Sequence, residues 1–310
     1  MKGRSFKERL FFFTCIFLAI LVAIALYLVP LSAQRSVLAL DDLITLGKSQ
    51  LFQKTIPSGL NAHRTFLGAY NDASYGSATT QQKIQIRSYL AFSRILDLLF
   101  RNDGGTIDTL TELLATYGVE RTGDTLETLE FNPRVNNDKK IIIPATAPSG
   151  EAIRAFLTGP FLTTVNASLA DMDEVINQCG AGEGVFIIEK NYISATETLD
   201  VEIDAGDYYL YRASLKALKA WALIVSAYNL DVNVQEVVGL ANADLLNFKG
   251  LLDRYPNLLK LLTAATPPAY NGAGKLAEAK AALQGAIADY LVASEKIRHY
   301  GPAAPGSKKL

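Results

Sequence analysis

Four carboxylates stand close together in the stretch 199–213, and their spacing is the first in this chain that suggests chemistry. Asp200, Glu202, Asp204 and Asp207 fall within eight positions. An EF-hand calcium loop needs glycine at its sixth position and glutamate at its twelfth, but counting from Asp200 gives alanine and tyrosine. Alternation with β-branched residues predicts a half-buried edge strand, and Asp204 or Asp207 is a suitable N-terminal cap for a helix. We therefore expect a strand-to-helix joint here and no metal site.

A glycine-rich segment follows Cys179 and invites comparison with a phosphate-binding loop. Such loops run from a strand into a helix, whereas here a helical pattern comes first and a strand-like pattern follows. The segment therefore predicts the end of a helix. A nucleophilic Cys179 would need a histidine base, and the chain has only His63 and His299, with no family motif around either. The common hydrolase motifs are absent as well, so we expect no catalytic residues, no cofactor and no metal.

Three basic side chains follow one another on a face of the helix predicted at 204–229. Arg212, Lys216 and Lys219 stand at steps of four and three residues. They could hold an anionic ligand, and together with Tyr208 and Tyr211 they form the candidate ligand-binding site. The alternative interpretation is a solvated stripe whose long aliphatic stems cover apolar neighbours.

The hydrophobic periodicity predicts a mostly α fold with a small β-hairpin. A helical module at 34–102 contains helices near 37–54, 58–72 and 79–101, and a loop-rich insertion at 103–148 contains a short helix near 107–117 and one strand at 141–143. A helical domain at 149–300 follows, with a kink or a fresh helix start at Pro160, a hairpin at 185–204, helical patches between 234 and 262, and a helix at 275–299. Residues 301–310 read as a flexible tail or linker.

The helix at 204–229 is expected to be central to the fold. Tyr211, Leu215, Leu218 and Ala222 recur on one face of it. Because the basic residues occupy another face, we expect Trp221, the single tryptophan, to lie on the buried side.

Small residues and one aromatic recur in the helical module at positions that resemble a tetratricopeptide repeat. Gly47 stands in the first helix, and Ala62, Phe66 and Ala69 follow in the second at steps of four and three. In that family small residues let paired helices approach and the aromatic locks them. An ordinary helical hairpin with small residues at the crossing explains the same pattern.

The chain as a whole resembles uncharacterised exported bacterial helical proteins with a tetratricopeptide-like N-terminal module. The stretches that carry this resemblance are 62–95, 210–220 and 227–231. The resemblance implies a helical fold and an extracytoplasmic location. It brings no activity, cofactor or site residue with it.

The N-terminus reads as an export signal. Residues 1–33 combine a basic start, an apolar run from Leu10 to Val29, and the tripeptide Leu31-Ser32-Ala33 that a signal peptidase could cut. The run is also long enough to span a bilayer, so an uncleaved inner-membrane anchor formed by residues 10–29 is the alternative. With one cysteine beyond it, the chain forms no intramolecular disulfide, which suits a bacterial periplasm or cell surface.

Composition and charge exclude one class of partner and leave three hypotheses for the function. The formal net charge of the 310 residues is -1, and no basic block is longer than Lys139-Lys140, so nucleic acid is an unsuitable partner. The first hypothesis is a non-enzymatic binding or structural protein of the cell envelope that contacts a protein or peptide through helical surfaces. The alternative is a periplasmic module with a small-ligand pocket between the central helix and the hairpin. An enzyme of unrecognised type is the third hypothesis. Contact with a membrane is expected only through the alternative N-terminal anchor.

Overall fold

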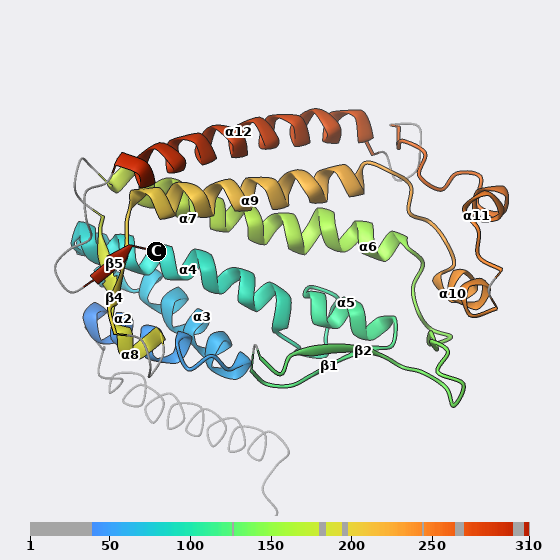
Figure 1. Ribbon diagram of the computed structural model, residues 1–310, viewed down its shortest axis with the longest axis horizontal. Helices are drawn as coiled ribbons and strands as arrows, with labels where there is room; N and C mark the ends of the chain where they lie inside the picture. Colours follow the sequence, from blue (N-terminus) through green and yellow to red (C-terminus); the bar gives the residue numbers. More distant parts are fainter. Residues whose placement is uncertain are drawn as a thin grey trace, which may run out of the picture. The chain divides into compact units, whose positions relative to one another are not determined.

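Long helices, each packed against the next, form the framework of the protein (Figure 1). The computed structural model describes residues 39–125, 127–179, 184–193, 198–243, 245–263, 270–299 and 307–309. Within them the fold is mostly helical with two short antiparallel strand pairs, which confirms the predicted class. The chain divides into two compact units, Met1–Ala39 and Leu40–Leu310. The predicted signal or anchor, residues 1–33, lies outside the described residues.

The N-terminal helices form where the periodicity predicts them. They are α2 (Leu40–Leu51), α3 (Ile56–Tyr70), the 3-10 helix η1 (Ala73–Ser77) and α4 (Thr80–Phe100). Thr79 caps α4 in a reciprocal capping box with Gln82. The backbone of α2 passes so close to α3 that a Cβ on Gly47 would stand 2.5 Å from the Phe66 ring. A small residue is therefore required at this helix crossing, whichever family the hairpin belongs to.

The segment after α4 contains less helix and more strand than the sequence indicates. It forms α5 (Leu110–Thr116) and an antiparallel pair, β1 (Val119–Thr122) with β2 (Glu130–Pro133). The expected strand at 141–143 is wrong, because only an isolated bridge joins Ile141 to Val135 before Pro144 interrupts the chain. The strands β1 and β2 escape prediction since they are four residues long and mostly polar.

Pro160 changes the helix type instead of breaking the helix. The helix α6 (Glu151–Phe156) continues through a π-helical turn, η2 (Leu157–Phe161), into α7 (Leu162–Gln178). Proline has no amide hydrogen to donate, and the wider turn accommodates its ring. The helix is thus continuous through a π turn at Pro160, and α7 ends at Gln178 with Cys179 as its C-terminal cap, as the glycine-rich segment predicts.

The carboxylate-rich stretch leads from a strand into the central helix. β3 (Phe186–Ile188) pairs antiparallel with β4 (Asp200–Ile203), and the short helix α8 (Lys190–Ile193) lies between them. β5 (Ser307–Lys309), from the predicted tail, adds to β4 in parallel. The expectation of an edge strand at 200–203 is therefore wrong: β4 is the middle strand, and Glu202 is buried. The rest of the tail lies outside the described residues.

The central helix and the last helix complete the framework. α9 (Ala205–Ser226) is followed by α10 (Val234–Asn242), α11 (Phe248–Arg254) and α12 (Gly272–His299). α7, α9 and α12 run antiparallel in turn, and α7 also packs on α4 (Figure 1). The main core contains Phe66 and Leu90 together with Val165 and Leu215. The stretches 34–102 and 149–300 therefore share one core.

Candidate functional site

A cavity of about 480 Å³ opens between the central helix and the β3–β4 hairpin. α9 contributes Tyr208 and Tyr211, and the hairpin contributes Phe186 and Ile188. The other walls come from α4, the turn between α2 and α3, the first turns of α3, and Met172 of α7. Of the five predicted ligand residues, the two tyrosines line this cavity. It lies where the small-ligand hypothesis placed a pocket, although its walls are far more apolar than that hypothesis supposed.

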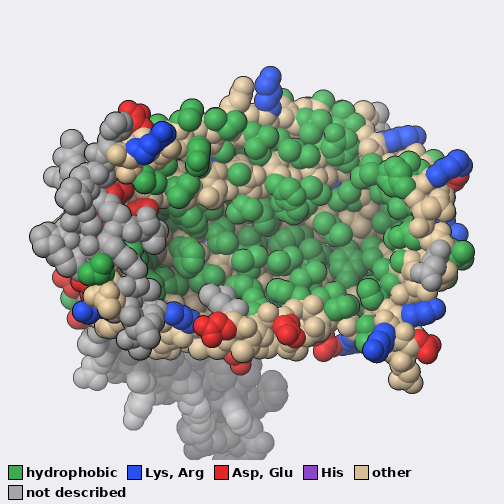
Figure 2. Space-filling view, viewed as in Figure 1, with side chains coloured by type: hydrophobic (Ala, Val, Ile, Leu, Met, Phe, Trp, Pro, Cys, Tyr) green, Lys and Arg blue, Asp and Glu red, His purple; other side chains and the backbone are tan. Residues whose placement is uncertain are grey.

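The face of α4 that lines the cavity is apolar along its length. Tyr89, Phe92, Leu96 and Phe100 follow one another at steps of three and four residues, which puts them on one side of the helix. Phe92 is 46 % exposed, so this side of α4 also reaches the surface. Figure 2 shows hydrophobic side chains filling the hollowed middle of one face of the molecule, with charged side chains along its margins. The cavity is therefore suited to hydrocarbon or aromatic matter.

The two α9 tyrosines that line the cavity, Tyr208 and Tyr211, join the cavity wall to its neighbours by hydrogen bonds. The Tyr208 hydroxyl donates to the Gly184 carbonyl at 2.6 Å, and the Tyr211 hydroxyl donates to the Ala91 carbonyl at 3.3 Å. Burial raises the pKa of both side chains well above the usual value. Both phenols stay protonated at neutral pH and act as donors to the backbone, which gives them a structural task at the site.

Tyr89 differs from them because its hydroxyl is buried without a hydrogen-bond partner in the described part of the chain. The side chain is 5 % exposed. Burial raises its pKa, and the nearby Glu189 carboxylate raises it further. The phenol is therefore neutral and keeps a proton to donate.

The basic stripe on α9 does not line the cavity. Arg212 and Lys216 both bind the buried carboxylate of Asp289 on α12, and Arg212 also reaches Asp173 on α7. Lys219, the third member, is half-buried. For Arg212 and Lys216 the solvated-stripe interpretation is wrong, since carboxylates of the neighbouring helices already neutralise their charges.

The same arrangement overturns the expectation for Trp221. Its side chain is 52 % exposed and makes an edge contact with Phe161, at 6.0 Å between ring centroids. The outward face of α9 carries apolar side chains, and part of the inward face carries ion pairs with α12. Hydrophobic periodicity alone predicted the opposite orientation of α9. It could not take account of Asp289, the acidic partner of Arg212, because that residue lies 77 positions away in the sequence.

The carboxylates of the opening stretch build the predicted joint. Asp204 caps α9, its Oδ1 accepting from the Gly206 amide at 2.7 Å, and Asp207 accepts from the Asp204 amide at 2.9 Å. This reciprocal pair is a capping box. Asp200 accepts from the Lys190 amide at 2.8 Å and so closes the hairpin. The predicted strand-to-helix joint is confirmed.

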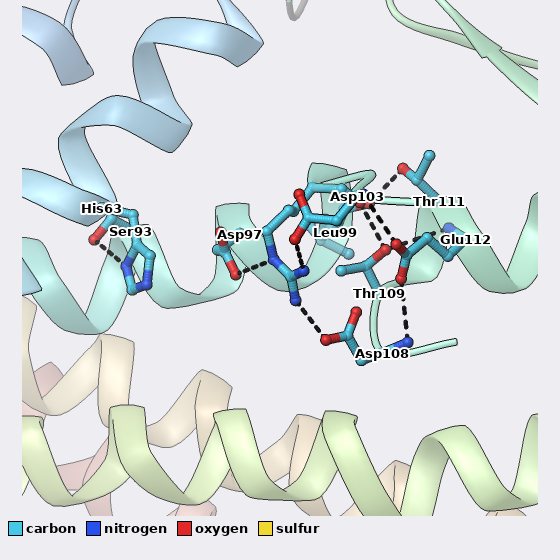
Figure 3. A network of polar contacts seen from close by, with 10 residues as sticks. His63, Ser93, Asp97, Leu99, Asp103, Asp108, Thr109, Thr111 and Glu112 are labelled. Atoms are coloured by element: carbon cyan, nitrogen blue, oxygen red, sulfur yellow. Dashed lines mark hydrogen bonds and ion pairs between the residues drawn. The ribbon is translucent and has the colours of Figure 1, made fainter. Parts of the chain in front are cut away.

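A polar network joins the end of α4 to α5 (Figure 3). Arg101 binds Asp97, Asp103 and Asp108, while both carboxylate oxygens of Glu112 accept from backbone amides of the connecting loop. Burial alone would raise the pKa of Asp108, but the hydrogen bonds and charge of Arg101 outweigh it and hold this pKa below its ordinary value. The cluster fixes a loop, with each carboxylate engaged by a donor.

His63 and Ser93, beside that network, have the residue types of a nucleophile and its base but not the geometry. The His63 Nδ1 and the Ser93 Oγ lie 3.3 Å apart (Figure 3). The Ser93 hydroxyl donates to the Leu90 carbonyl. The His63 Nδ1 must then donate to Ser93, so it cannot take its proton. Ser93 is also fully buried, and Asp97 is bound to Arg101. Burial lowers the pKa of His63, which favours the neutral ring.

Cys179 is equally unsuited to nucleophilic attack. Burial raises the pKa of its thiol to about 11. At neutral pH almost none of it is thiolate.

Among the described residues no group of three or more histidine, cysteine, aspartate or glutamate side chains is placed to hold a metal ion. No helix within the same ranges is both long and apolar enough to cross a membrane.

Comparison of the chain with protein-family models, with curated proteins and with solved structures found no match. The resemblance to tetratricopeptide-like exported proteins therefore stays a prediction. The case for a function rests on the cavity and on the surfaces around it.

Proposed function

We propose that the chain is an exported, non-enzymatic binding protein that holds a small, largely apolar molecule in the cavity between α9 and the hairpin. The observation that carries the proposal is the cavity itself, about 480 Å³ with almost wholly aliphatic and aromatic walls. Ligand pockets of proteins span about 300 to 1,000 Å³ and are lined in this way. An empty apolar space of this size would cost folding free energy, so a ligand that fills it stabilises the protein.

Binding accounts for the site better than catalysis does. Within the described residues, Ser93 is buried and turned to a carbonyl, and Cys179 is protonated at neutral pH. The charged residues that line the cavity are Lys54 and Asp207. Asp207 is engaged in the cap of α9. None of these groups is arranged as a nucleophile with its base.

Export supplies the setting of the proposal. Its support is the basic start and the apolar run at residues 10–29. N-terminal sequencing of periplasmic or secreted material is expected to begin near Gln34. An intact Met1 in the membrane fraction would indicate the inner-membrane anchor, and intact protein in the cytosol would contradict export.

Two glycines of α3 provide a matched test of the cavity. Gly59 is buried, lines the cavity, and would place a Cβ 3.4 Å from a Leu96 methyl. Gly68 is exposed and has open space around it. Titration of the purified chain with the fluorescent probe N-phenyl-1-naphthylamine is expected to give saturable binding. The Gly59→Leu variant fills the cavity and is expected to weaken binding by about tenfold or more, about 1.4 kcal/mol.

The control variant Gly68→Leu is expected to bind the probe as the unmodified chain does. Both variants must first show the helical circular dichroism and cooperative melting of the parent. Equal probe affinity in the parent and in Gly59→Leu would contradict the proposal, as would the lack of any saturable binding by the parent.

A second candidate function is contact with a protein or peptide of the cell envelope. It is favoured by the exposed apolar face of α9, which presents Leu210, Leu218, Trp221 and Ile224. A photo-crosslinking residue at position 221 is expected to give one discrete adduct in intact envelopes. The same residue at Phe248, which is 64 % exposed on α11 against 52 % for Trp221, serves as the control. Identical patterns from both positions would count against this candidate.

A further inference from the structure

The solvent-facing side of α9, all of which the structure describes, carries no charge. Every exposed side chain of this helix is uncharged, and four of them are large and apolar: Leu210, Leu218, Trp221 and Ile224. The exposed hydroxyl of Ser214 donates to the Leu210 carbonyl at 3.0 Å. A helix that faces water normally presents charged and polar side chains there. This side of α9 therefore offers hydrocarbon and few hydrogen bonds.

An apolar stripe on α12 continues this surface. Leu283, Ile287, Tyr290 and Ile297 are exposed, and their steps of four, three and seven residues put them on one side of the helix. The stripe meets the start of α9, because a Cβ on Gly206 would stand 3.0 Å from the Ile297 Cγ1. Figure 2, in the view of Figure 1, shows hydrophobic side chains over α12, α9 and α4. The exposed apolar residues of α9 and α12 together are called the apolar face.

The cavity opens beside the apolar face. Phe92 of α4 lines the cavity, is itself exposed, and contacts Tyr211 of α9 with 6.3 Å between ring centroids. Figure 2 shows the hollow surrounded by hydrophobic side chains. Contiguous exposed apolar surface of this kind marks a site of contact with a protein or a membrane. Whatever covers the face also reaches the mouth of the cavity.

Two cations stand at the ends of the α12 stripe. Lys280, Ile287, Leu291 and Arg298 follow one another at steps of seven, four and seven residues, so both cations lie on the apolar side of the helix. Neither forms an ion pair with a described residue, and Arg298 is held by the carbonyl and hydroxyl of a serine one turn earlier. The exposed Glu295 falls outside the stripe. The stripe therefore presents positive charge next to hydrocarbon.

This combination of hydrocarbon and positive charge is complementary to an anionic lipid surface. Acyl chains need no hydrogen bonds from the protein, and anionic headgroups pair with the two cations. Trp221 and Tyr290 supply the amphipathic rings that are enriched where a membrane meets water. A protein partner would bring hydrogen-bonding groups that this face cannot match. A second copy is disfavoured too, because a twofold pairing of two α12 stripes about their middle brings the lysine of each copy near the arginine of the other.

We propose that the apolar face docks the protein onto a membrane surface of anionic lipid, with Trp221 and Tyr290 among the headgroups and the mouth of the cavity turned toward the acyl chains. This surface is separate from residues 10–29, so docking requires no anchor. Docking goes beyond the proposed function. One consequence rests on that function: the apolar molecule held in the cavity enters it from the membrane.

Trp221 reports docking directly, because it is the single tryptophan and lies on the apolar face. The full chain is mixed with vesicles of dioleoylphosphatidylglycerol, with or without bromine on the acyl chains. The Trp221 emission is expected to shift to the blue and to be quenched by the brominated lipid. Docking on dioleoylphosphatidylcholine, which has no net charge, is expected to be about tenfold weaker or more. The signal is local, so a chain that keeps residues 10–29 gives the same readout.

Two leucines of matched exposure test whether the apolar face is responsible. Leu283 on α12 is 42 % exposed, and Leu46 on α2, outside the face, is 41 % exposed. Leu283→Glu is expected to weaken docking by about tenfold or more, because it places a carboxylate among acyl chains and anionic headgroups. Leu46→Glu is expected to dock as the parent does. Both variants must first show the circular dichroism and cooperative melting of the parent.

A double variant tests the contribution of charge. Lys280→Gln combined with Arg298→Gln is expected to dock on the anionic vesicles only about as strongly as the parent docks on phosphatidylcholine. Equal docking of the parent on the two lipids would refute the anionic surface. Equal losses in Leu283→Glu and Leu46→Glu would refute the apolar face.

The outcomes also separate this inference from the proposed function. Gly59→Leu fills the cavity and is expected to lose the probe N-phenyl-1-naphthylamine while its Trp221 docks as in the parent. Trp221 that neither vesicle quenches would overturn membrane docking, even where the probe still binds in the cavity. A discrete protein adduct from position 221 in that case would identify a protein as the occupant of the face.

Discussion

Arg212 on α9 and Asp289 on α12 form a two-bond ion pair inside the interface of their helices. The Arg212 Nε donates to Oδ2 at 2.8 Å and Nη2 donates to Oδ1 at 2.7 Å, while Lys216 approaches the same carboxylate at 2.7 Å. Asp289 is 5 % exposed. The positive charges of α9 are thus neutralised by a carboxylate of α12 inside the protein. The opposite face of α9 carries the exposed apolar side chains.

Replacing Asp289 with asparagine is expected to destabilise the protein by about 3 to 5 kcal/mol. The substitution removes the carboxylate that Arg212 and Lys216 share, leaves Arg212 with the exposed Asp173 as its acidic partner, and so leaves part-buried positive charge poorly compensated, which is costly. Urea unfolding at pH 7 measures the change. Lys249→Ala, which breaks an exposed i,i+4 pair with Asp253, is the control and is expected to cost less than about 0.5 kcal/mol. Similar losses in both variants would contradict the assigned role of the interface.

Stability is expected to fall in acid through this carboxylate. Burial alone would raise the pKa of Asp289. The hydrogen bonds and charges of Arg212 and Lys216 lower this pKa by more than burial raises it, so the pKa in the folded protein lies below the ordinary value. The stabilisation is complete above the unfolded pKa of about 3.9 and is lost as pH falls through the folded pKa. Unfolding free energies between pH 5 and pH 2 are expected to drop less steeply in Asp289→Asn than in the parent. Parallel curves would refute the link.

Trp221→Ala is expected to cost about 1 kcal/mol or less, because the side chain is half exposed and its recorded aromatic contact is with Phe161. Trp221 is the single tryptophan, so fluorescence reports this position alone. The emission maximum is expected close to that of tryptophan in water, with ready quenching by iodide. Phe156→Ala, in the core, is the contrast at about 3 to 5 kcal/mol. A blue-shifted, unquenched emission would show the indole covered.

Cys179 is expected to react slowly with iodoacetamide. With the thiol pKa raised to about 11, only about 0.1 % is thiolate at pH 8. The rate of alkylation is expected to rise about tenfold for each pH unit up to that pKa. Mass spectrometry of timed samples follows it, with the protein unfolded in urea as the reactive control. A rate that levels off near pH 8 would contradict the burial of this thiol.

Gly47→Ala is expected to destabilise the protein by about 1 to 3 kcal/mol, since its Cβ would meet the Phe66 ring and press it toward Tyr89. Gly68→Ala places the same methyl in open space on α3. This control is expected to stabilise the protein by about 0.5 to 1 kcal/mol, because alanine is the better helix former. Thermal melts of both variants measure the difference, and equal melting temperatures would contradict the close crossing of α2 and α3.

The sequence by itself determined the features that depend on local order. Helix positions followed from hydrophobic periodicity, and the cap of α9 followed from Asp204 and Asp207, since each needs only neighbours along the chain. The irregular turn at Pro160 and the end of α7 before Cys179 could also be predicted, because each depends on residues next to it in the chain. Even the location of the pocket, between the central helix and the hairpin, could be predicted, because Tyr208 and Tyr211 stand next to that joint.

The tertiary structure decided which face of each element is covered and what the cavity is made of. Arg212 and Lys216 face inward because Asp289 and Asp173 meet them there, and no local pattern contains those distant carboxylates. β4 is a middle strand because β5 returns from the far end of the chain. The apolar walls and the unpaired hydroxyl of Tyr89 exist only once α4, α9, the hairpin and the turn between α2 and α3 come together, so no pattern along the chain contains them.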